Sequence, residues 1–175
     1  MTTSSLRLTK EKEQLGSERA GALADRLEKG AQMLAEFAAS LTPAEWTTKV
    51  PHDGRKVGVM VHHVGNMYPI EIKFALMVAG GTPIAGVTMA DIDSINAGHA
   101  VEFDKVTKED ALDFLRINSQ AAAWAIRALT DEELDRAVTI SLYGDAPLTC
   151  QFFIEDHALR HSYHHFARIR KALNR

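Results

Sequence analysis

Apolar residues recur at intervals of three and four positions along four long segments of the chain, which is the period of an amphipathic helix. In the first segment, for example, Leu23, Leu27 and Leu34 share one face. The pattern predicts long helices over residues 17–41, 56–78, 107–129 and 151–173. Four such helices in a chain of 175 residues predict an all-α protein built as a four-helix bundle.

The segments between the long helices carry weaker signals. A capping box at residues 42–45 predicts a short helix, and Pro69 predicts a kink inside the second long helix. Residues 87–103 have a mixed pattern that we interpret as a loop with a short helix. Alternating residues on either side of a Gly-Asp turn predict a small β-hairpin over residues 138–150. We expect residues 1–16 to form a flexible arm and residues 17–175 to form a single domain.

Composition narrows the class of partner. The 20 basic and 23 acidic residues give a net charge of −3 without long runs of either sign, so nucleic acid and anionic membranes are not expected partners. Neither a membrane span nor a secretion signal is visible. The single cysteine, Cys150, allows no disulfide within the chain and fits a cytoplasmic location; we expect it to be a small buried side chain.

Histidine is the unusual part of the composition, with eight residues of which four lie between positions 157 and 165. On a helical wheel of about 100° per residue, His161 and His165 fall on the apolar face of the last helix. His63 falls at the centre of the apolar face of the second helix. Two helices therefore direct imidazoles into what is expected to be one core.

The remaining histidines fall elsewhere on the same wheels. We place His157 and His164 on the polar edge of the last helix and His62 on the edge of the second helix, about 100° from His63. His52 and His99 fall in predicted loops and receive no role. His157, His164 and Glu71 are weak candidates for groups that support a metal site or transfer protons beside it; a solvated rim or a salt bridge is the alternative for each.

Three inward-facing imidazoles allow two interpretations. They can bind one divalent ion and leave a fourth position open, which is typical of catalytic metal sites. Alternatively, they are core histidines that hydrogen-bond to backbone carbonyls or to Tyr68 and Asn66, in a bundle that binds no metal. Imidazole suits zinc, nickel and iron alike, so the ligand set does not select the metal.

Two motifs resemble those of the DinB/YfiT-like superfamily. The run from His157 to Ile169, with an HxxxH pair ending at His161, is similar to the motif of its last helix. The run from Val57 to Val64 resembles its second-helix motif, and residues 93–97 are similar to a stretch before its third helix. Carried over by position, the three metal-binding histidines of the family fall on His63, His161 and His165.

The resemblance implies an up-down-down-up four-helix bundle that binds zinc, nickel or iron and is often a homodimer. It implies a metal-dependent hydrolase or a transferase that uses a low-molecular-weight thiol, acting on a small-molecule substrate. A non-catalytic metal-binding or stress-associated interaction protein is the alternative. Two positions depart from the family: Arg168 stands where many members carry glutamine, and His161 stands where the thiol-dependent isomerases carry glutamate.

Overall fold

The computed structural model describes residues 16–175, so the predicted arm at residues 1–16 lies, apart from Gly16, outside the described residues. Four long helices form the bundle. They are α2 (Glu18–Ala39), α4 (Val57–Ala79), α6 (Lys108–Arg127) and α9 (Arg160–Leu173). The all-α prediction is therefore confirmed, and helix α4 continues through Pro69 to Ala79. None of the helices within residues 16–175 is long and apolar enough to cross a membrane.

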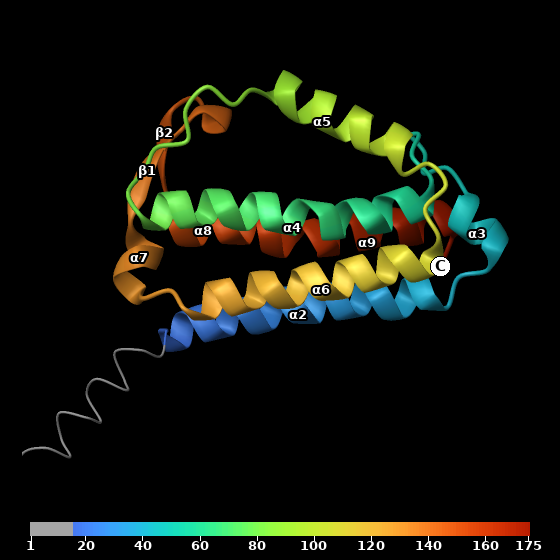
Figure 1. Cartoon of the computed structure of the whole chain (residues 1–175), viewed down its shortest axis with the longest axis horizontal. Coiled ribbons are helices and arrows are strands. Elements are labelled where there is room, and N and C mark those ends of the chain that lie inside the picture. The colour runs from blue at the N-terminus through green and yellow to red at the C-terminus, as the bar shows by residue number, and fades with distance from the viewer. Residues whose placement is uncertain (1–15) are drawn as a thin grey trace, which may run out of the picture.

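The four long helices run up, down, down and up. Figure 1 shows α2 and α9 running in one direction and α4 and α6 in the other. Because α4 and α6 are parallel neighbours, the chain must return along the whole bundle between them, and α5 (Met89–Glu102) makes that return. The α4–α6 and α2–α6 pairs have the most extensive contacts.

The interpretation of residues 87–103 as a loop with a short helix is wrong, because α5 occupies most of this segment. This helix has 14 residues and begins at a capping box in which Thr88 and Asp91 bond each other's backbone amides. The sequence pattern missed the length of this helix because most of it is exposed, so it has no continuous apolar face. Among the residues of α5, only His99 is buried.

Close approach between helices depends on glycine at two places. Gly65 of α4 lies against the backbone of α6: a Cβ there would lie 2.9 Å from the Leu115 Cα, and Asn118 donates to the Gly65 carbonyl at 3.1 Å. Gly30 of α2 faces the side chain of Ser162 on α9, where a Cβ added to the glycine would lie 2.4 Å from the serine Oγ. These contacts set the positions of α4 and α9, the two helices that carry the predicted metal ligands.

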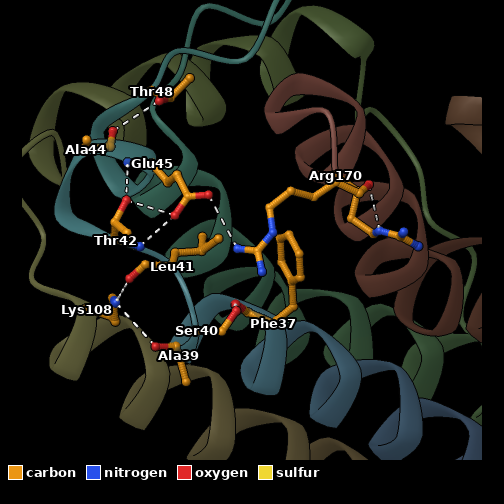
Figure 2. Close-up of polar contacts among 11 residues, drawn as sticks. Phe37, Ala39, Ser40, Leu41, Thr42, Ala44, Glu45, Thr48, Lys108 and Arg170 are labelled. Carbon is orange, nitrogen blue, oxygen red and sulfur yellow. Dashed lines mark hydrogen bonds and ion pairs between the residues drawn. The ribbon is translucent and has the colours of Figure 1, made fainter.

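The corner between α2 and α4 contains a short helix, α3 (Pro43–Thr47), that begins at the predicted capping box. Thr42 and Glu45 bond each other's backbone amides, as Figure 2 shows. Lys108, at the start of α6, donates to the carbonyls of Ala39 and Leu41 (Figure 2). Polar contacts therefore connect this corner of the chain to the start of the third long helix.

The chain between α6 and α9 is built from short elements. They are α7 (Asp131–Asp135), β1 (Ala137–Ile140), the 3-10 turn η1 (Ser141–Tyr143), β2 (Ala146–Thr149), α8 (Cys150–Ile154) and the π-helical turn η2 (Glu155–Leu159). Strands β1 and β2 pair antiparallel, which confirms the predicted hairpin. Ile84, in the linker after α4, bonds to β1 alongside it.

Candidate metal centre

The three predicted ligands come together between α4 and α9. Their candidate ligand atoms all lie within 4.8 Å of one another, and they form the group of this kind found within residues 16–175. The Nε2 atoms of His63 and His161 are 3.1 Å apart. Two nitrogens at about 2.1 Å from a tetrahedral ion would be about 3.4 Å apart, so this separation suits a shared ion.

The last helix is interrupted just before the cluster. Helix α8 leads through the π-helical turn η2 into α9, where we predicted one continuous helix over residues 151–173. A π turn inserts about one extra residue, so it rotates the faces of the preceding segment relative to those that follow. His161 and His165 both lie after this turn, and for that reason their predicted shared face agrees with the structure.

Burial keeps two of the three imidazoles neutral. His63 and His165 are buried, whereas the His161 side chain is 16% exposed. Burial, followed by the neighbouring His161, lowers the pKa of His63 to about 2. The same causes hold the pKa of His165 well below its ordinary value. Neutral imidazole is the form that binds a metal ion, so both rings are ready to act as ligands.

Glu71 orients the third imidazole. This carboxylate is buried on α4, two turns after His63, and its Oε1 lies 2.7 Å from Nδ1 of His161. The carboxylate accepts a hydrogen bond from Nδ1–H of His161, which leaves the lone pair on Nε2, the nitrogen that faces His63. A carboxylate behind a ligating histidine is common in metal sites because it sets the tautomer and increases the basicity of the ring. Glu71, weighed from sequence as a base or a salt-bridge partner, therefore contacts a candidate ligand directly.

The donor set satisfies a test of fit for a metal ion. Nδ1 of His63 and Nδ1 of His165 are buried and have no hydrogen-bond partner within the described part of the chain. Neither Tyr68 nor Asn66, the partners considered in the metal-free interpretation, is bonded to these rings. The partners that the metal-free interpretation requires are therefore missing at these nitrogens. An ion on Nε2 of His63 would not occupy its Nδ1, so the fit rests on the Nε2 atoms of His63 and His161, which face each other at a separation that suits a shared ion. Three imidazoles supply the nitrogen ligands that zinc, nickel and iron accept.

A cavity of about 200 Å³ opens beside the cluster on the α9 side. Six side chains line it, and two of them belong to the cluster: Asp156, His157, Arg160, His161, His164 and His165. Solvent and small solutes therefore have access to the candidate ligands from this side. The lining is polar and includes the exposed guanidinium of Arg160, which pairs with Asp156 at 3.0 Å.

The two histidines expected on the rim lie there. His157 is half-buried, with its Nε2 3.0 Å from the Tyr143 hydroxyl, and that hydroxyl donates to the Asp156 carboxylate. His164 is exposed, and its ring centroid is 5.3 Å from that of His165. Both side chains line the cavity without belonging to the three-histidine group.

A second histidine pair lies behind His63, and the sequence interpretation missed it. His62 was placed on a helix edge and His99 in a loop, but both are buried. Nδ1 of His62 lies 2.8 Å from Nε2 of His99, and the His62 ring stacks on Phe103 at 4.0 Å. His62 is covered because α5 and α6 pack over that edge of α4. The i, i+4 spacing of His99 and Phe103 is the signal in the sequence for this pair, because it places both rings on one face of a helix.

Arg168, one of the two departures from the family pattern, has a local partner. Its Nη1 lies 3.2 Å from Oδ2 of Asp53, a carboxylate that also binds Arg55 at 2.6 Å. Asp53 belongs to the turn before α4, so this ion pair connects that turn to the last helix. The arginine therefore joins the last helix to the turn that precedes α4.

Comparison with known proteins agrees with this architecture. Residues 26–169 match the family model of the DinB superfamily. YfiT from Bacillus subtilis, whose structure is described as that of a probable metal-dependent hydrolase with an unusual four-helix bundle topology, has a similar fold. The TM-score is 0.73 at 18% sequence identity, over 90% of this chain and 88% of that one. Curated protein sequences include no significant match. The chain belongs to the DinB superfamily.

Proposed function

We propose that this protein is a metal-dependent enzyme that binds one divalent ion through His63, His161 and His165 and acts on a small molecule. The observation that carries the proposal is the convergence of three imidazoles next to an open cavity. Three protein ligands leave room for a further one, as in catalytic zinc sites. Zinc, nickel or iron would suit the donor set.

A divalent ion at this position would lower the pKa of a water or thiol that it binds and would polarise a substrate carbonyl. The side chains of the protein supply the rest. Glu71 accepts a hydrogen bond from Nδ1–H of His161, and the bundle core shields His63 and His165 from solvent. Arg160, exposed at the cavity, would bind an anionic group of the substrate, and His157 and His164 are placed to exchange protons with it.

Hydrolysis is the reaction that we favour, because the cavity offers polar groups around the cluster and its lining has no cysteine, serine or threonine to act as a nucleophile. Cys150 is buried, donates to the Ala75 carbonyl at 3.4 Å, and has a pKa raised to about 11 mainly by burial. Transfer of a low-molecular-weight thiol is the second candidate reaction. Its nucleophile would have to enter from solution through the same cavity. A reduced, buried cysteine fits action in the cytoplasm.

The metal content of the purified protein tests the first part of the proposal. Elemental analysis should find about one equivalent of zinc, nickel or iron in the wild type, and this should be lost in His63→Ala and His161→Ala. His52→Asn is the matched control, since His52 is exposed and asparagine tolerates its left-handed backbone (φ 63°). Circular dichroism would show whether each variant is folded. A folded wild type without metal at micromolar ion concentrations would contradict the proposal and favour structural histidines.

Measurements of catalytic activity test the second part of the proposal, that the protein is an enzyme. Loaded and chelated protein would be compared on p-nitrophenyl esters and on the coupling of low-molecular-weight thiols to an electrophilic arene. Ester cleavage that requires metal supports the hydrolase, and metal-dependent thiol coupling supports the transferase. Stoichiometric metal without either activity over a broad substrate panel would contradict the enzyme and favour a non-catalytic metal-binding protein.

A further inference from the structure

A second cavity lies between α4 and α5, and its lining differs from that of the polar cavity. Its volume is about 320 Å³. Most of the side chains around it are apolar; those used below are Met67, Ile70 and Phe74 of α4 and Ile92, Ile95 and Asn96 of α5. A cavity of about 150 Å³ admits a benzene ring, so this one has room for a ring with substituents or for a short aliphatic chain.

Both walls of this cavity belong to helices that carry a histidine at or beside the cluster. On α4, Met67 follows His63 by four residues and therefore lies on the same helix face, one turn further along. On α5, Asn96 precedes His99 by three residues, and the His99 ring lies 5.4 Å from the His63 ring. One helical turn is about 5.4 Å. The lining does not include the cluster histidines, so a molecule in the cavity would need a linker that spans at least about one helical turn to reach His63.

One polar atom at this apolar cavity lacks a partner. Oδ1 of Asn96 is buried and accepts no hydrogen bond from any group in residues 16–175. An unpaired buried acceptor is unfavourable, and the cost is recovered when a ligand donates an O–H or N–H group to it. The other polar residue of the α5 wall, Asp91, already bonds Thr88 in the capping box. Asn96 is therefore the group available to orient a ligand.

Helix α5 is placed to admit such a ligand. It covers the outer face of α4 and is set apart from the four long helices (Figure 1). Most of its side chains are exposed, including Ile95 at 47%, and its packing on the other elements is slight. A ligand between α4 and α5 would cover apolar surface that α5 alone leaves partly open. The larger cavity of about 490 Å³ is lined by α2 and α6, neither of which carries a histidine of the cluster.

We propose that the α4–α5 cavity binds the apolar body of the substrate, with Asn96 accepting a hydrogen bond from it and the reacting group extending to the histidine cluster. This inference rests on the proposed function and specifies its substrate class. The substrate is a small molecule with an aromatic or short aliphatic body that carries one O–H or N–H donor. A few bonds separate that body from the ester, amide or electrophilic group that reacts.

Phenol and toluene are suitable probes, because they share a ring and differ in the donor. In zinc-loaded protein with labelled methyl groups, both should shift the NMR signals of Met67, Ile92 and Ile95. Asn96→Leu preserves size and removes the acceptor. It should weaken phenol binding about fivefold to tenfold and leave toluene binding unchanged or tighter. Ala85→Phe, at an exposed position on the cavity rim, should abolish the binding of both.

Gln120→Leu is the matched control, since Gln120 lines the cavity between α2 and α6 and should affect neither probe. Zinc affinity, measured by calorimetry, should be the same in all three variants. Absence of methyl shifts in the zinc-loaded wild type would overturn the inference, as would equal losses for phenol and toluene in Asn96→Leu.

Cobalt loading separates this inference from the proposed function. If the cavity adjoins the metal site, paramagnetic Co²⁺ should increase the relaxation rate of bound phenol protons, and chelation should reverse the effect. Bound Co²⁺ without relaxation of bound phenol would overturn the inference and leave the metal site standing. Phenol binding that follows the Asn96→Leu pattern in a chain that takes up no metal would overturn the proposed function, while the cavity would remain a ligand site.

Discussion

At the scale of single residues, the candidate site depends on imidazoles that are kept neutral and correctly oriented. Burial keeps His63 and His165 neutral, and the carboxylate of Glu71 orients His161. The sequence placed all three histidines on inward faces, because helical phase depends on local geometry alone. The role of Glu71 could not be obtained in that way, since its partner is 90 positions away in the chain.

Replacement of Glu71 should weaken metal binding without preventing folding. Glu71→Gln keeps the shape of the side chain but removes the charge that stabilises a ligating His161, so we expect a 10- to 100-fold loss of affinity. Isothermal titration with Zn²⁺ or Ni²⁺ measures this loss. Glu109→Gln, at an exposed position on α6, should have no effect. An unchanged affinity in Glu71→Gln would show that the carboxylate does not support the site.

The metal-free protein should lose stability in mild acid. The folded-state pKa values of His63 (about 2) and His99 (about 4), both lowered chiefly by burial, lie below the unfolded value of about 6.5. The unfolded state therefore binds more protons once the pH falls below 6.5. Above pH 6.5 these histidines leave the free energy of unfolding at its full value. Below pH 6.5 each of them lowers it by up to about 1.4 kcal/mol per pH unit.

Urea denaturation of the chelated protein at pH 7.5, 6.5 and 5.5 measures this dependence. His63→Met removes one of the titrating groups, so its stability should fall less steeply over the same range. Equal slopes in the two proteins would show that His63 is not held neutral by the fold.

At the scale of elements, the capping box predicted at residues 42–45 begins a helix. The structure has further capping boxes at Thr88 and Thr130, and these begin helices as well. Helix α5 was underestimated because only one of its residues is buried, and a helix with little buried surface has a weak apolar period. The apolar pattern does not reveal the π-helical turn η2. Its two buried residues, Ala158 and Leu159, are apolar and adjacent, as they can also be in an uninterrupted α-helix.

Gly65 should tolerate no side chain, because α6 approaches α4 at that point. Gly65→Ala gains helix propensity but places a Cβ 2.9 Å from the Leu115 Cα, so we expect a net loss of about 1–2 kcal/mol of stability. Gly21→Ala, which has open space around its Cβ, should instead add about 0.5–1 kcal/mol. Chemical denaturation of both variants gives the comparison. Stabilisation by Gly65→Ala would mean that the two helices are not in close contact there.

At the scale of the whole molecule, the candidate site joins helices that are distant in the chain. His63 lies on α4, and His161 and His165 lie on α9, so an ion bound by all three connects the second helix to the last. The ion pair between Asp53 and Arg168 connects the same two parts of the chain. Anything that binds this arrangement stabilises the folded state as a whole, because the unfolded chain does not hold the three imidazoles together.

Chelation should therefore lower the melting temperature. An ion present at 100 times its dissociation constant adds about 2.7 kcal/mol, which corresponds to roughly 5–10 °C in a domain of this size. Differential scanning calorimetry with and without EDTA measures the shift, and His161→Ala should show none. A wild-type melting temperature that does not respond to zinc would indicate that the cluster binds no ion.

The sequence by itself determined that there are four long helices, the capping box at residues 42–45 and the inward direction of His63, His161 and His165, because these depend on local periodicity and on neighbouring residues. The tertiary structure decided the burial of His62 and His99, the pairing of Glu71 with His161 and the cavity beneath α5. These features arise where α5, α6 and α9 pack on α4. Such packing brings together side chains that are far apart along the chain, and no local pattern in the sequence predicts these contacts.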